Sequence, residues 1–129
     1  MSSPAAPFVV DANAKGNNTR IDFQFAAAGR TLKGSVVVQG TFSEEDISSL
    51  RENLADGAEF DPQKLGLPDL IVQMPASWDG DEYLHRITRI MATDAEFDDE
   101  APSTDQIIAL VEVSSAPQVW STEALTATR

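Results

Sequence analysis

The sequence predicts an α+β fold, in which an antiparallel sheet of about four strands is packed by one main amphipathic helix. Two segments, 19–26 and 31–39, alternate apolar and polar side chains as half-buried strands do. A third segment, 44–56, repeats apolar side chains at spacings of three and four, as a helix with one buried face does. With 129 residues, 42% of them apolar, the chain has the size and composition of a single domain.

We expect three regions along the chain. Residues 1–18 mix Pro, Ala, Ser, Asn and Gly and predict an irregular, flexible arm with room for one short edge strand. Residues 19–114 are expected to form the single α+β domain, and the polar residues 115–129 predict a flexible C-terminal tail. No signal peptide is expected, and no apolar run approaches the ~20 residues of a membrane helix.

Residues 19–39 predict an antiparallel hairpin. Gly29, in the turn at 27–30, supplies the positive φ that tight hairpin turns favour. Gly34 falls on the inner face, where its missing side chain allows close packing or a bulge. The other inner-face residues are Ile21, Phe23, Phe25, Leu32, Val36 and Val38.

Two helical segments follow the hairpin. Ser43 is a favourable N-cap for the 44–56 helix, whose first turn is acidic and whose end is expected at Gly57. Its buried face comprises Ile47, Leu50 and Leu54. A single helical turn is expected between Phe60 and Leu67, because a capping Asp precedes a Pro and is followed by two stop residues; these are Asp61, Pro62, Gly66 and Pro68.

The second half of the chain contains runs that fit more than one element. Residues 69–74 predict a short strand. Residues 83–93 and 107–113 each fit a strand or a helix, and their β-branched content favours strands. Ser103 and Gln106 resemble a helix capping box before the second run. Its short length and its Ile and Val content nevertheless favour a buried strand.

Charge is unevenly distributed. The net charge is −12, with +2 in residues 1–42 and −14 in the remainder. Such a field repels phosphate backbones and anionic lipids, so direct nucleic-acid or membrane binding is not expected, and a basic protein surface is the favoured partner. Acid that only keeps the protein soluble is the alternative explanation. The absence of Cys matches a reducing compartment, which predicts a cytoplasmic protein.

Candidate chemistry is sparse, and we expect no catalytic residue, no bound metal and no cofactor. His85 is the only histidine, and no nucleophile or phosphate-binding motif accompanies it. The carboxylates near it in sequence, Asp79, Asp81 and Glu82, leave a small metal-dependent hydrolase as an alternative. The acidic segment 94–105 resembles a calcium loop only superficially, so its binding of divalent cations stays open.

We therefore predict a non-catalytic, acidic protein-binding module of the inhibitor, immunity-type or regulatory kind. A nucleic-acid-mimicking inhibitor of a DNA-binding protein and a structural subunit of a larger assembly, such as a viral particle, are further alternatives. The oligomeric state is left open.

Arg86 and Arg89 are expected on opposite faces of their strand. Trp78 and Tyr83 are candidate aromatic anchors, and the predicted acidic face comprises Glu44, Glu45, Glu52, Asp56, Glu59, Asp94, Glu96, Asp98, Asp99 and Glu100.

Overall fold

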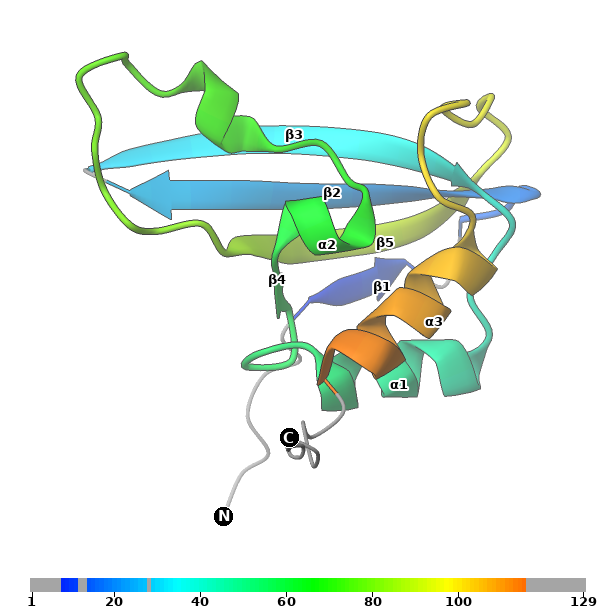
Figure 1. The fold of residues 1–129 in the computed structure, drawn as a ribbon. Helices are drawn as coiled ribbons and strands as arrows, with labels where there is room; N and C mark the ends of the chain where they lie inside the picture. Colours follow the sequence, from blue (N-terminus) through cyan, green and yellow to red (C-terminus); the bar gives the residue numbers. More distant parts are fainter. Residues whose placement is uncertain (1–7, 12–13, 28, 116–129) are drawn as a thin grey trace.

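The computed structural model describes residues 8–11, 14–27 and 29–115, and it confirms the α+β fold (Figure 1). The strands form one mostly antiparallel sheet, in the order β1-β5-β2-β3, and the two-residue β4 also pairs with β5. β1 runs parallel to β5, and the other strand pairs are antiparallel. The strands are β1 (Val9–Asp11), β2 (Asn18–Ala27), β3 (Arg30–Gln39), β4 (Glu59–Phe60) and β5 (His85–Thr93).

The β2–β3 hairpin is confirmed with the predicted faces. Its ten-residue strands pair from Asn18 opposite Gln39 to Ala27 opposite Arg30, and Gly29 has a φ of 75° in the turn. A Cβ atom on Gly34 would lie only 2.9 Å from Leu70 Cδ2, so the close packing expected at this glycine is present. Of the six predicted inner-face residues, five are buried and Leu32 is half-buried.

Helix α1 (Glu44–Asn53) begins where the sequence predicts and ends three residues early. Ser43 and Asp46 form a reciprocal capping box, with both hydrogen bonds 3.0 Å long. The predicted end at residue 56 is wrong because Leu54 already has extended backbone angles. Asp56 and Gly57 then turn the chain with positive φ angles of 51° and 79°.

Two short helical elements connect α1 to β5. Helix α2 (Pro62–Leu65) confirms the predicted single turn, since the Asp61 side chain accepts the Gln63 N–H and Gly66 ends the turn with a φ of 71°. The strand predicted at 69–74 is wrong: this segment is the 3₁₀ helix η1 (Leu70–Gln73). The Asp69 carboxylate caps it by accepting the Ile71 N–H at 2.9 Å, which favours a helical turn over a strand.

The two ambiguous runs resolve differently. Residues 85–93 form strand β5, as predicted for the 83–93 run, whereas the strand predicted at 107–113 is wrong because it lies within helix α3 (Thr104–Ser115). The Ser103 and Gln106 capping box is present, with hydrogen bonds of 2.9 and 3.3 Å. The α3 residues Ile107 and Val111, one helical turn apart, are both buried.

Part of the predicted N-terminal arm belongs to the sheet. Residues 9–11 form the edge strand β1, and Phe8 is buried beside it with the Arg51 guanidinium 4.9 Å from its ring centroid. The short edge strand for which the arm had room is therefore present, and residues 8–11 belong to the fold. Residues 1–7 and 12–13 of the arm, and the predicted tail from residue 116 onward, lie outside the described residues.

The helices cover one face of the sheet and leave the other open (Figure 1). α1 packs against α3, α3 against α2, and η1 against β2 and β3. The core between the layers joins the inner side chains of the sheet, such as Phe23 and Ile87, to helical residues such as Leu50 and Ile107. Within the described part of the chain, no helix has the length and apolar character needed to cross a membrane.

Candidate functional site

The ten carboxylates of the predicted acidic face do not share one surface. Three of them, Glu44, Glu45 and Glu52, line a hollow on α1. Another three, Asp98, Asp99 and Glu100, line a separate hollow beside the loop that follows α2. Among the described residues, the only member of the ten that forms an ion pair is Glu59, whose Oε2 atom lies 3.6 Å from Arg86 Nη1.

The strongest acidic cluster lies on the solvent side of α1 and the adjoining end of α3. We name it the acidic helix surface and define it by Glu44, Glu45, Glu52 and Glu112, all of which are exposed. They surround a hollow of about 530 Å³ whose lining contains no Lys, Arg or His. α1 positions its share of the carboxylates because the apolar residues of the opposite face hold the helix on the core.

Two members of the acidic helix surface sit where a helix disfavours negative charge. Glu52 is the penultimate residue of α1, and Glu112 begins the last turn of α3. The carboxyl end of a helix carries partial negative charge, so an acidic side chain there costs about 0.3–1 kcal/mol. The compensating contact at Glu112 is one hydrogen bond, which the Ser49 hydroxyl donates to Oε2 at 2.8 Å.

The remaining acidic predictions fall in loops. Asp94 and Glu96 are exposed, and Asp56 is in the turn after α1. The Asp98 backbone N–H donates to the Val37 carbonyl at 2.8 Å, which holds the 94–103 segment against β3. These carboxylates are positioned by loop backbone and do not extend the acidic helix surface.

The two predicted aromatic anchors have different surroundings. Trp78 is half-buried and packs edge-on against Phe25, with ring centroids 5.9 Å apart. Tyr83 remains 52% exposed, so it is the freer of the two for contact with a partner. Asp79, Asp81 and Glu82, between these aromatics, are all exposed.

His85 is built into the core. Its side chain is fully buried among the rings of Phe23, Phe25 and Phe60. Nε2 accepts the Leu70 N–H at 2.9 Å, so Nδ1 carries the proton and donates to the Tyr83 carbonyl at 2.9 Å. This pattern ties the 70–83 segment to β5.

The electrostatics of His85 favour the neutral ring. Burial lowers the pKa of the imidazole from its usual 6.5, although the hydrogen bond to the Tyr83 carbonyl and the carboxylates of Asp69 and Asp61 raise it. The Asp69 Oδ1 atom lies 3.6 Å from Nε2 and also caps η1. Both ring nitrogens thus have backbone partners, which leaves neither directed at a substrate or metal. Nowhere in the described residues do three or more His, Asp or Glu side chains gather as a metal site would require.

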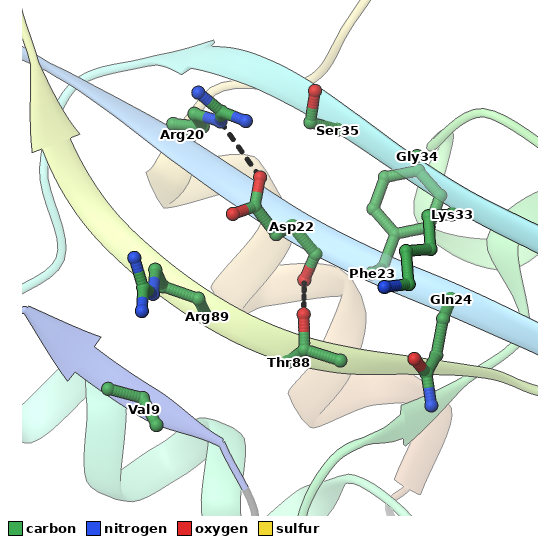
Figure 2. A pocket seen from close by; sticks show the side chains of 10 residues that line it. All are labelled: Val9, Arg20, Asp22, Phe23, Gln24, Lys33, Gly34, Ser35, Thr88 and Arg89. Carbon is green, nitrogen blue, oxygen red and sulfur yellow. Dashed lines mark hydrogen bonds and ion pairs between the residues drawn. The ribbon is translucent and has the colours of Figure 1, made fainter.

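A second candidate surface, which no sequence pattern predicted, lies on the open face of the sheet. We name it the sheet groove; it has a volume of about 550 Å³ and lies on the side of β5, β2 and β3 away from the helices (Figure 2). Its charged lining residues are Arg20, Asp22, Lys33 and Arg89, so three cations meet one carboxylate. The polar neighbours are Gln24, Ser35 and Thr88.

Strand register explains how the sheet groove is assembled. Asp22 on β2 is opposite Arg89 on β5 and Ser35 on β3, and these three form one row across the sheet. Arg20, two residues along β2, donates from Nε to Asp22 Oδ1 at 2.8 Å. Figure 2 shows Asp22 between the side chains of Arg20 and Arg89. Lys33 lies in the neighbouring row, opposite Gln24.

A one-residue bulge corrects the prediction for Arg86 and Arg89. Both were expected on opposite faces of β5, but they are opposite Gln24 and Asp22, which share the open face of β2. Thr88 is the extra residue, and its hydroxyl donates to the Asp22 carbonyl at 3.2 Å. The bulge lets Ile87 and Ile90 both point into the core while both arginines face outward.

Comparison with protein-family models, with curated protein sequences and with solved structures found no match to this chain.

Proposed function

We propose that this protein is a non-catalytic binding module that docks a basic protein surface through the acidic helix surface. The observation that carries the proposal is the gathering of four exposed carboxylates from two helices around a hollow with no cationic lining residue. A partner that presents Lys and Arg there would find these carboxylates without a competing ion pair in the described part of the chain. Charge complementarity of this kind accelerates association and selects the partner.

The placement of Glu52 and Glu112 supports a binding role over simple solubility. Acidic side chains that serve only solubility are not required at the carboxyl ends of helices, where the helix dipole disfavours them. Residues that lower the stability of the free protein are typical of functional surfaces, because a bound cation would relieve the repulsion. Glu52 and Glu112 therefore lower the stability of the free protein and would raise its affinity for a cationic partner.

The proposal includes a cytoplasmic location, which is supported by the absence of Cys. The alternatives receive less support. Nucleic-acid mimicry needs carboxylates along one elongated face, whereas the ten predicted ones are divided between separate hollows and loops. A hydrolase needs an accessible His85, which is buried. Nothing on the described surface specifically favours a structural subunit, so that role stays a prediction.

The test compares two variants that change net charge equally. The first is the triple variant E44K/E45K/E52K on α1, and the matched control is the triple variant D98K/D99K/E100K in the loop. Each wild-type and variant protein is used to enrich partners from an extract of the producing cells, and association with the purified partner is measured at low and physiological salt.

We expect the α1 variant to lose the partner and the loop variant to retain it. Association of the wild type should slow severalfold as ionic strength rises to about 0.15 M, where the Debye length is about 8 Å. Equal losses in the two variants, or association that is indifferent to salt, would contradict docking at the acidic helix surface.

A further inference from the structure

The sheet groove concentrates positive charge in a protein that has little of it. The chain has 9 Lys and Arg residues against 21 Asp and Glu, and three of the nine line this groove. All three emerge from the open face of a sheet whose other face forms the core. This charge distribution is opposite to that of the acidic helix surface and calls for a separate explanation.

Two of the three cations have no carboxylate partner. Arg20 is paired with Asp22, whereas Lys33 and Arg89 form no ion pair with any residue that the structure describes. They flank β2 from β3 and β5 in neighbouring rows, so two strand spacings and a two-residue offset place their backbones roughly 12 Å apart. Long, flexible side chains at that separation can converge on one group above Asp22 and Ser35.

The polar residues between the two cations indicate a mixed donor and acceptor site. The Ser35 hydroxyl, next to Asp22 in the same row, can donate to an oxyanion. Asp22 is held from one side by Arg20 through Oδ1, which leaves Oδ2 to accept a hydrogen bond. A bare anion would be repelled by Asp22, so the best ligand also carries a hydroxyl group that donates to this carboxylate.

The overall field limits the size of the ligand. At physiological salt the Debye length is about 8 Å, so a small ligand in the groove senses the nearby cations more than distant carboxylates. A polyanion such as nucleic acid would extend beyond the groove over a protein of net charge −12. The groove volume of about 550 Å³ lies within the usual range for small-molecule sites, roughly 300–1,000 Å³.

We propose that the sheet groove binds a small hydroxylated organic anion, with a phosphate or carboxylate group held by Lys33 and Arg89 and a hydroxyl group donating to Asp22. The site is independent of partner docking at the acidic helix surface. Each charge-assisted hydrogen bond contributes strongly to affinity, so removal of one cation should weaken ligand binding about tenfold.

The experiment titrates the full chain with glycerol 3-phosphate, glycerate and glycerol, which share a carbon skeleton and differ in the anionic group. Backbone amide shifts are followed by NMR up to about 10 mM probe, which detects millimolar affinity. The variants are R89Q and K33Q, with R30Q as the matched control because it removes the same charge from β3 outside the groove. Thermal unfolding verifies that each variant is folded.

We expect at least one of the two anions to shift amides of the groove strands, and glycerol to have no effect. R89Q and K33Q should each weaken binding about tenfold, and R30Q should leave it unchanged. Binding of either anion supports the proposal, and the tighter one identifies the acidic group. Absence of binding by both anions, equal binding of glycerol, or equal weakening by R30Q would overturn it.

Discussion

Acidification from about pH 7.5 to about pH 5.5 is expected to destabilise the protein through His85, in a range where most carboxylates remain ionised. The folded state holds this imidazole neutral, because the ring is fully buried and Nε2 accepts the Leu70 N–H. Adding a proton to Nε2 would break that hydrogen bond and place a charge among three phenylalanine rings.

The sign follows from the direction of the pKa shift. Burial lowers the pKa of His85 in the folded state below 6.5, the value of an unperturbed imidazole. Below pH 6.5 the unfolded chain therefore binds a proton that the folded chain does not. The free energy of unfolding then falls by about 1.4 kcal/mol per pH unit until the pH reaches the lower folded-state pKa, and the full contribution of the neutral ring is present above pH 6.5.

The assay is urea unfolding of the wild type and of H85Q at several pH values. The glutamine side chain does not titrate, and its amide oxygen can still accept the Leu70 N–H. At neutral pH we expect H85Q to be less stable by about 1–3 kcal/mol, because the ring contacts are lost. At about pH 5.5 this difference should shrink by up to about 1.4 kcal/mol, since only the wild type loses stability through position 85.

The comparison removes the contribution of the carboxylates, because they are the same in both proteins. A difference between wild type and H85Q that stays constant from about pH 7.5 to about pH 5.5 would contradict the lowered pKa of His85. It would mean that His85 has the same affinity for protons in the folded and unfolded states.

Three further predictions concern stability, and urea unfolding measures each. G34A should destabilise the protein by about 1–3 kcal/mol, because the new Cβ would lie 2.9 Å from Leu70 Cδ2; a neutral result would show that Leu70 moves aside freely. S103A should cost about 0.5–2 kcal/mol by removing the N-cap of α3, and an unchanged midpoint would mean that the capping box is dispensable. E52Q should stabilise by about 0.3–1 kcal/mol and E44Q should destabilise by a similar amount, because the two carboxylates sit at opposite ends of α1. Equal signs would contradict the dipole argument.

The elements that were predicted correctly from the sequence are those in which all local signals favour the same structure. In the β2–β3 hairpin, alternation, the Gly29 turn and the position of Gly34 all favour the same register. The start of α1 was predictable because Ser43 and the acidic first turn are local signals. Its end was not, since Gly57 marks the turn rather than the last helical residue.

The wrong elements are those where two local signals disagree. In α3 the β-branched residues favour a strand and the Ser103 capping box favours a helix. A helix places Ile107 and Val111 on one face, where both are buried, and α3 packs against α1 and α2. This packing favours the helix over the strand. Packing against distant segments of the chain cannot be predicted from the local sequence of α3.

The candidate surfaces were predictable only in part. Glu44, Glu45 and Glu52 follow from the α1 pattern, but Glu112 joins them only once α3 is known to be a helix beside α1. The sheet groove depends on the Thr88 bulge, which turns Arg89 to the open face. A bulge changes the facing of every later residue in a strand, and nothing in the residue alternation marks it unambiguously.

The two surfaces should act independently, because the layered fold places them on opposite sides of the core. The sheet groove opens on the strand layer, and the acidic helix surface faces solvent beyond α1. A helix with its side chains is about 10–12 Å across, which exceeds the Debye length of about 8 Å at physiological salt. The triple variant E44K/E45K/E52K should therefore bind the groove probe within about twofold of the wild type at that ionic strength. A larger gain in affinity would mean that the carboxylates of α1 reach the groove through the protein, and the two binding events would then be coupled by the same factor in both directions.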